Sequence, residues 1–182
     1  PQYAMFRREV PVPDGLRAAT CYVTAAGSGA QQQLLGAYKL FLNGEVAGVG
    51  PGRGDCSLIR DQDPGLCMEY DIIDITSRLQ QAGPILAVGI QSFHLGGVAG
   101  GVQLELRFET ADGGIVVHGT NSSWWSHDAS DYFGPYSSTG RYKAPRENQN
   151  ASEYPGRWQL PGYADAQRGW TPSERVRPAA HQ

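Results

Sequence analysis

The sequence is short of cysteine, of charge and of long apolar runs, and each shortage excludes a class of protein. Three cysteines in 182 residues are too few for a disulfide scaffold. A net charge of −3 gives no electrostatic basis for binding nucleic acid or an anionic membrane. No run approaches the roughly 20 apolar residues that span a bilayer. We therefore expect a globular protein with neither a nucleic-acid nor a membrane partner.

The sequence also lacks the motifs of common active sites. Its four histidines show no ligand spacing, so zinc is not expected. It contains neither a Gly-x-Ser-x-Gly elbow nor a phosphate-binding loop. Glycoside hydrolysis would need two carboxylates about 5–9 Å apart. No spacing among the 18 acidic residues points to such a pair. No catalytic residue is assigned, and no cofactor is required.

The three cysteines leave two interpretations open. Cys56 and Cys67 bracket a polar loop, and a disulfide between them would suit an oxidising compartment. The alternative is that all three thiols are free. Cys21 lies inside an apolar run and is expected in the core.

Two N-glycosylation triplets begin at Asn121 and Asn150, and they matter only in a secreted eukaryotic protein. The first residues of the chain contain neither a methionine nor a signal-peptide pattern. We therefore expect a chain that is processed or excised from something longer. An extracellular or periplasmic location is favoured.

Glycine and proline are abundant, with 24 and 12 residues spread along the chain. This distribution is typical of many short strands joined by turns. Apolar and polar residues alternate over 102–110, which places Leu104 and Glu105 on opposite faces of a strand. The period favours an all-β antiparallel sandwich. An acceptable cap residue and good helix formers predict one short helical turn at 77–81. The predicted strands are residues 5–12, 17–26, 38–42, 45–49, 67–75, 85–93 (a central strand), 102–110 and 115–118.

The clearest turn signal is Asn43-Gly44, between two short strands. A type I′ turn requires positive φ at both central residues, which these residue types tolerate best. The hairpin leads into the glycine-rich stretch 50–56, which carries Arg53 and Asp55. That stretch is either the edge of a small polar site or a tight corner of the sandwich.

After Asn121 the regular pattern gives way to aromatic residues among proline, glycine, aspartate and serine. We expect residues 1–120 to form the sandwich core and 121–175 to form a long irregular wrap on the same domain. Residues 176–182 should be a linker or tail.

The tryptophans in this wrap carry separate predictions. Trp124 and Trp125 are adjacent, so one should face the core and the other should be partly exposed. Trp158 and Trp170 should pin the wrap onto the sandwich.

Several segments, taken in order, resemble one family. Among them are the hairpin turn Asn43-Gly44 and the stretch Gly50-Pro51-Gly52 that follows it. The full set covers residues 5–9, 18–27, 38–44, 49–52, 70–76, 111–113, 121–124, 161–165 and 169–172. Together these segments look like the N-terminal jelly-roll domain of bacterial-type α-L-rhamnosidases, glycoside hydrolase family 78. Their order and spacing agree over nearly the whole chain.

This resemblance implies a galactose-binding-like jelly roll placed before a catalytic (α/α)₆ barrel. In that family the barrel carries the acidic catalytic residues, so this chain alone is expected to be non-catalytic. Its partners would be the other domains of the parent glycoside hydrolase. In some members a related sandwich binds L-rhamnose with the help of calcium. By spacing, Asp55 falls on the aspartate of the loop used there, which makes it the candidate calcium ligand.

A sugar site needs hydrogen-bond partners for vicinal hydroxyls and a flat apolar face for the ring. Arg53 and Asp55 could supply the first need, and His94 lies on a second glycine-rich loop. The alternatives are a surface salt bridge at Arg53, an Asx-type turn at Asp55 and a structural role for His94. The candidates for stacking on the ring are Trp124, Trp125 and Tyr136.

Three functions stay open at this point. The first is a non-catalytic accessory domain of an α-L-rhamnosidase-like hydrolase. The second is a genuine carbohydrate-binding module for a rhamnose-type sugar, with or without calcium. The third is a protein-interaction domain that uses the aromatic wrap.

Overall fold

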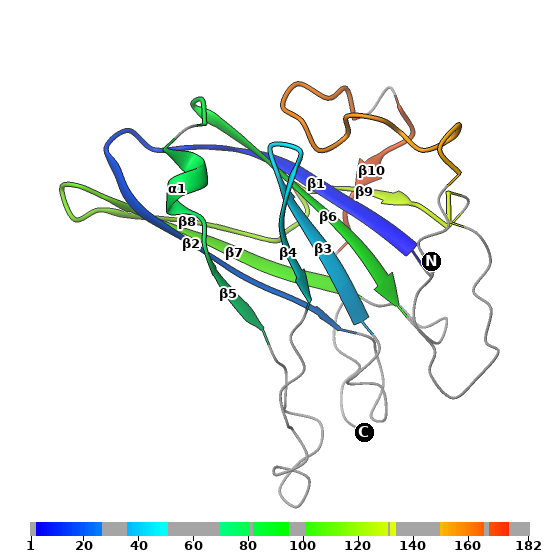
Figure 1. Cartoon of the computed structure of the whole chain (residues 1–182), viewed down its shortest axis with the longest axis horizontal. Coiled ribbons are helices and arrows are strands. Elements are labelled where there is room, and N and C mark those ends of the chain that lie inside the picture. Colours follow the sequence, from blue (N-terminus) through cyan, green and yellow to red (C-terminus); the bar gives the residue numbers. More distant parts are fainter. Residues whose placement is uncertain are drawn as a thin grey trace, which may run out of the picture.

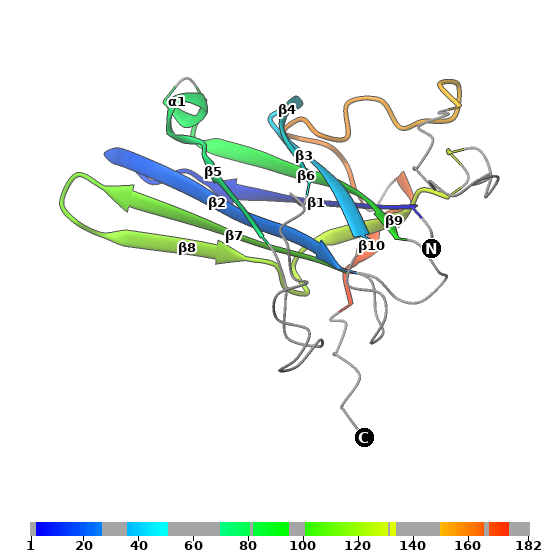
Figure 2. The ribbon, with the colours of Figure 1, turned by 60° about the horizontal axis from the view of Figure 1, so that its bottom comes forward.

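The computed structural model describes residues 3–26, 36–50, 70–80, 82–94, 101–130, 132–133, 150–165 and 168–174. Two antiparallel sheets stack face to face (Figures 1 and 2). The six-stranded sheet consists, in spatial order, of β10 (Thr171–Pro172), β9 (Trp125–Asp128), β1 (Tyr3–Pro11), β6 (Ile85–His94), β3 (Gly36–Leu42) and β4 (Glu45–Gly50). The four-stranded sheet consists of β5 (Asp71–Asp74), β2 (Leu16–Ala26), β7 (Gly101–Thr110) and β8 (Ile115–Gly119). A short helix, α1 (Thr76–Leu79), follows β5. The predicted all-β antiparallel sandwich is confirmed, and so is the central place of β6.

The core between the sheets follows the two-residue period of its strands. On β7, Leu104, Leu106 and Phe108 are buried, whereas Glu105 between them is exposed. Successive side chains of a strand point to opposite faces, so only the alternate set reaches the facing sheet. Cys21 of β2 lies in the same core, as predicted.

A second apolar cluster covers the outer face of the six-stranded sheet. Figure 2 shows residues 150–165 (orange) running over this face, on the side away from the four-stranded sheet. The ring of Trp158 is fully buried, 5.5 Å from that of Phe41 and 5.6 Å from that of Trp170 between centroids. Trp158 also lies directly on Gly89 of β6, where no Cβ separates the ring from the strand. Trp158 and Trp170 therefore hold the C-terminal segment, which is the part of the wrap described from residue 150 onward, on the sandwich, as the sequence predicted.

The hairpin between β3 and β4 has the predicted turn. Asn43 has φ 48° and Gly44 has φ 88°, the positive values that a type I′ turn requires. The Asn43 side chain makes a further contact, because its Oδ1 accepts a hydrogen bond of 2.8 Å from the backbone N–H of Ala87 on β6. The turn residue thus also fastens the hairpin to its neighbouring strand.

The bounds of β5 and α1 differ from the predicted ones. The strand expected at 67–75 spans Asp71–Asp74 in the described residues, and residues 67–69 lie outside them. It ends at Asp74 because the carboxylate of that residue accepts a hydrogen bond of 2.9 Å from the N–H of Thr76, which turns the chain into α1. The helix accordingly begins at Thr76 and ends at Leu79, earlier than the predicted turn at 77–81.

The wrap predicted at 121–175 is also more regular than expected, because it adds two strands to the larger sheet. β9 pairs with β1 from Ala4 to Arg7, and β10 pairs with β9. Trp125 is the one residue of β9 (Trp-Ser-His-Asp) with a marked strand preference, so its extended form depends mainly on pairing with β1.

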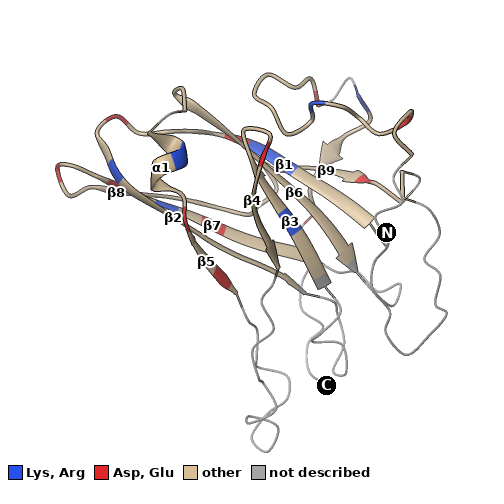
Figure 3. Cartoon of the chain, in the orientation of Figure 1, with Lys and Arg blue, Asp and Glu red and all other residues tan. Residues whose placement is uncertain are grey.

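Figure 3 shows basic and acidic residues interspersed over the described part of the chain. Within that same part, no helix has the length and apolarity needed to cross a membrane.

Candidate functional site

The first strand sends charged side chains to both sides of the larger sheet. Because alternate residues of a strand face opposite ways, Arg7 and Glu9 point to the C-terminal segment while Arg8 points to the other face. Accordingly, the Arg8 guanidinium lies 3.5 Å from the carbonyl oxygen of Gly119, at the end of β8 in the facing sheet. A strand with three successive charges inside a sandwich requires partners for them, and the C-terminal segment supplies those of Arg7.

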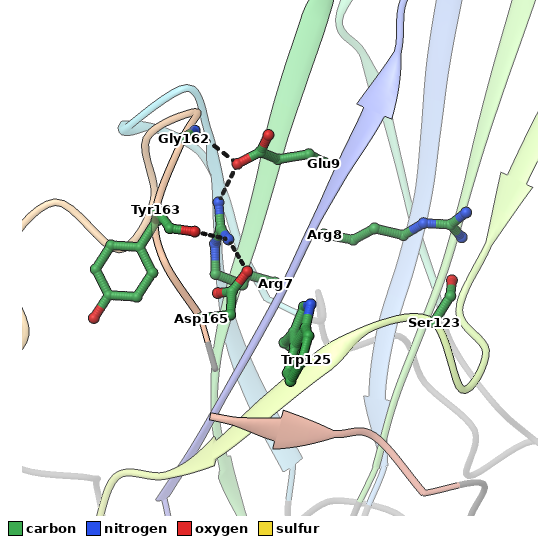
Figure 4. A pocket seen from close by; sticks show the side chains of 8 residues that line it. All are labelled: Arg7, Arg8, Glu9, Ser123, Trp125, Gly162, Tyr163 and Asp165. Atoms are coloured by element: carbon green, nitrogen blue, oxygen red, sulfur yellow. Dashed lines mark hydrogen bonds and ion pairs between the residues drawn. The ribbon is translucent and has the colours of Figure 1, made fainter. Parts of the chain in front are cut away.

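Arg7 is almost completely buried and uses both terminal nitrogens. Its Nη1 donates to the Asp165 carboxylate and, at 3.4 Å, to the carbonyl oxygen of Tyr163 (Figure 4). Its Nη2 donates to Glu9 Oε1 at 2.8 Å and to the carbonyl oxygen of Leu160 at 3.1 Å. A buried guanidinium is tolerated only with such pairing. The network therefore ties the segment 160–165 to the first strand.

Glu9 and Tyr163 complete the network. Glu9 Oε1 also accepts a hydrogen bond of 2.8 Å from the N–H of Gly162, so one oxygen serves both β1 and the C-terminal segment. The Tyr163 ring lies between two cations, with the guanidinium carbons of Arg7 and Arg168 at 5.3 and 4.8 Å from its centroid. Cation–π contacts of this kind add to the ion pairs that hold the segment.

A cleft of about 410 Å³ opens beside this network. It lies where β9 separates from β1, because the last residue pair between these two strands is Arg7 with Trp125. Figure 4 shows Trp125 near the middle of the lining, with Asp165 on one side and the Arg8 guanidinium on the other. The cleft is lined by Arg7, Arg8, Glu9, Ser123, Trp125, Gly162, Tyr163 and Asp165.

Several polar groups of the cleft have no partner within the described chain. Asp165 Oδ1 is buried without a hydrogen bond, and Glu9 makes its hydrogen bonds through Oε1 alone. The indole N–H of the partly exposed Trp125 donates to no described residue. Arg8 makes only the long contact to Gly119 among described residues. The cleft thus offers donors and acceptors to a molecule from outside.

Arg8 also affects a neighbouring titratable group. Burial and the positive charge of Arg8 hold the pKa of His118 below its ordinary value. Both effects favour the neutral form of the imidazole next to Arg8.

The residues predicted for the sugar site fall mostly outside the described chain. Arg53, Asp55 and Tyr136 belong to stretches that the structure does not describe, as do Cys56 and Cys67. The backbone of His94 ends β6, where it pairs with Gly36, and its side chain is not described. The loop site with its calcium ligand therefore stays a prediction. Among the described residues, no group of three or more His, Cys, Asp and Glu side chains is placed to hold a metal ion.

The two adjacent tryptophans divide as predicted. Trp124 is 2% exposed, belongs to the core between the sheets and donates its indole N–H to the carbonyl oxygen of Gly119 at 3.1 Å. Trp125 is partly exposed and lines the cleft. The structure thus brings Trp125 into a polar site, while Trp124 has no free ring face.

Both glycosylation triplets form exposed turns of one type. Asn121 Oδ1 accepts hydrogen bonds from the N–H and the hydroxyl of Ser123, at 2.9 and 2.6 Å. Asn150 Oδ1 accepts the same pair from Ser152, at 3.3 and 2.7 Å. These hydrogen bonds involve only the amide oxygens. Glycosylation of the amide nitrogens stays a prediction.

The charged groups of the cleft were not selected from the sequence. Three consecutive charges, Arg7, Arg8 and Glu9, lie within a predicted strand, and this was the available signal. A charge on a strand that is covered on both faces indicates a buried ion pair. Nothing local identifies Asp165 as the partner, because 158 residues separate it from Arg7.

No family model matches the chain, and no curated protein matches it. Solved structures do share its fold. An α-L-rhamnosidase from Dictyoglumus thermophilum matches 95% of this chain with a TM-score of 0.63 and 18% identity. A GH78 family rhamnosidase of Bacillus sp. GL1 matches 98% with a TM-score of 0.60 and 22% identity. This chain spans only 18% and 17% of those two enzyme chains.

A lectin from Pleurotus ostreatus, solved in complex with GalNAc, matches 94% of this chain and 36% of its own. Its TM-score is 0.51 and its identity is 16%. At such identities the likeness concerns the fold. The resemblance predicted from sequence is confirmed at that level: the chain has the fold of a small domain of GH78 α-L-rhamnosidases.

Proposed function

We propose that the chain is a non-catalytic accessory domain of an α-L-rhamnosidase-like glycoside hydrolase. The observation that carries this proposal is that the structural match covers very different shares of this chain and of the rhamnosidase chains. The match includes nearly all of this chain but less than a fifth of each rhamnosidase chain. A sandwich that recurs as a small part of larger enzymes is suited to pack on neighbouring domains.

The chemistry of the cleft supports a non-catalytic role. Glycoside hydrolysis requires one carboxyl group to donate a proton to the leaving oxygen. In the cleft, Glu9 and Asp165 both accept hydrogen bonds from the single buried guanidinium of Arg7. Both carboxyl groups are thus engaged in holding the segment 160–165 to β1.

Exposed apolar side chains on edge strands support packing on other domains. Val49 on β4 is 69% exposed and Ile72 on β5 is 63% exposed. On the opposite edge, Ile115 and Val117 of β8 are at least half exposed. Apolar residues gathered on unpaired edges favour contact with another protein surface.

The test compares two proteins with an aryl α-L-rhamnoside as substrate. We expect no hydrolysis by the purified 182-residue chain and hydrolysis by the full polypeptide encoded by its natural gene. Hydrolysis by the short chain that disappears in Glu9→Gln would overturn the non-catalytic role. A full polypeptide without activity would contradict the rhamnosidase context.

Carbohydrate binding is a second role that a specific observation favours. The lectin with the same fold is a sugar-binding protein by its description, and the cleft of this chain combines an aromatic ring with unpaired hydrogen-bonding groups. Titration of the chain with simple sugars tests this role independently of any hydrolysis.

A further inference from the structure

We infer that the cleft between β1 and the end of β9 is a subsite for a neutral, hydroxyl-rich sugar unit. The inference rests on the carbohydrate-binding role proposed above and gives that role a location. It concerns the cleft around Trp125, whereas Asp55 lies outside the described residues.

The arrangement of donors and acceptors specifies the ligand chemistry. Arg8 and the indole N–H of Trp125 are donors without a good partner among the described residues. The second oxygen of Glu9 is an acceptor without a partner among the described residues, whereas Asp165 Oδ1 is buried beneath the cleft surface. A sugar hydroxyl donates one hydrogen bond and accepts others, so adjacent hydroxyls can satisfy both kinds of group at once.

The charges of the cleft favour a neutral ligand. Among the described lining residues, two guanidinium groups and two carboxylates sum to no net charge. An anion would meet the two carboxylates, and a cation would meet Arg8, which no described acidic group pairs. A neutral polyol meets neither repulsion. Hydrogen bonds to charged groups are also the stronger kind, which suits a ligand that must replace its bound water.

The cleft is also apolar in one place and rigid in another. Trp125 is partly exposed and offers indole surface for the C–H face of a sugar ring. Arg7, itself fixed by Asp165, holds Glu9 through a hydrogen bond, so the Glu9 acceptor is positioned before a ligand arrives. The volume of about 410 Å³ is that of a small-ligand site.

The experiment titrates the intact chain with L-rhamnose and, separately, with N-acetyl-D-galactosamine. Binding is followed by calorimetry and by the NMR signal of the Trp125 indole N–H. Two variants address the cleft: Arg8→Gln removes the charge, and Trp125→Phe removes the donor but keeps an aromatic ring. Arg17→Gln is the matched control, because Arg17 lies on β2 and pairs with Glu109 away from the cleft.

We expect one of the two sugars to saturate the chain in the millimolar range and to shift the Trp125 signal. Arg8→Gln should raise the dissociation constant about tenfold or more, as loss of charged hydrogen bonds does. Trp125→Phe should raise it about threefold to tenfold, as loss of a neutral one does. Arg17→Gln should bind like the parent chain. Unfolding curves of all variants verify that they are folded. If Arg8→Gln does not fold, the binding measured with Trp125→Phe tests the inference.

Two results would overturn the inference. Saturable binding that both cleft variants retain would place the sugar elsewhere and leave the carbohydrate-binding role standing. Failure of both sugars to saturate the chain would remove the subsite, whereas the accessory role is decided by the hydrolysis assay.

Discussion

The guanidinium of Arg7 and the carboxylate of Asp165 form an ion pair between the first strand and the C-terminal segment, across 158 residues of sequence. Both side chains are largely removed from water, at 2% and 12% exposure. The pair therefore joins β1 to the segment 160–165, and both of its residues line the cleft. A contact of such sequence separation forms only when most of the fold is in place.

The first prediction concerns this pair. Asp165→Asn should lower the free energy of unfolding by about 3 kcal/mol, because it leaves the buried Arg7 guanidinium short of one anion. The measurement is urea unfolding of parent and variant. Arg17→Gln, which breaks the exposed pair with Glu109, is the control and should cost less than about 1 kcal/mol. Equal losses in the two variants would contradict the structural role of Asp165.

The second prediction concerns the seat of Trp158 on β6. A Cβ at Gly89 would approach Cζ3 of the Trp158 ring to 2.8 Å, and that ring is completely buried. Gly89→Ala should therefore cost about 1–3 kcal/mol of stability through overpacking. Gly83→Ala adds the same methyl group where no atom lies within 4 Å, and its effect should stay within about 0.5 kcal/mol. A thermal melt of both variants compares them, and similar melting temperatures would refute this packing.

The third prediction concerns the hairpin turn. Asn43→Ala should cost about 1–3 kcal/mol, because the buried N–H of Ala87 loses its acceptor. Asn43→Asp keeps an accepting oxygen and a residue type that tolerates positive φ, so it should retain most of the stability. Chemical unfolding measures the stability of the two variants. If the two variants were equally destabilised, the amide oxygen would not be the contact that matters.

Much of the fold could be predicted because its signals are local. The alternation over β7 predicts which side chains are buried, and Asn43-Gly44 predicts a type I′ turn from two residues. β9 could not be predicted in this way. Only Trp125 among its residues favours a strand, and β9 is extended because it pairs with β1 after the chain has folded back. The shortened β5 depends likewise on one side-chain contact, from Asp74 to the N–H of Thr76.

The candidate site was predictable only in part for the same reason. Trp125 could be selected because adjacent residues of an extended chain face opposite ways, and one of two tryptophans had to be accessible. The carboxylates and the guanidinium beside it come from segments far apart in sequence. Their roles follow from which charges are buried together, a property of the packed molecule that no spacing in the chain encodes.

The last prediction concerns the thiol of Cys21, which is free and buried in the core between the sheets. Burial raises the pKa of this thiol to about 12, from an ordinary value of 9.0. Since only the thiolate reacts, about one molecule in 10⁴ is reactive at pH 8 in the folded state, against about one in ten when unfolded. In a variant with Cys56→Ser and Cys67→Ser, a disulfide reagent such as dithiobisnitrobenzoate should therefore modify Cys21 within moments in concentrated urea. In buffer it should react at least a hundredfold more slowly, at a rate set by transient opening of the sandwich. Rapid modification in buffer would mean that the interface between β2 and the facing sheet opens far more readily than its complete burial implies.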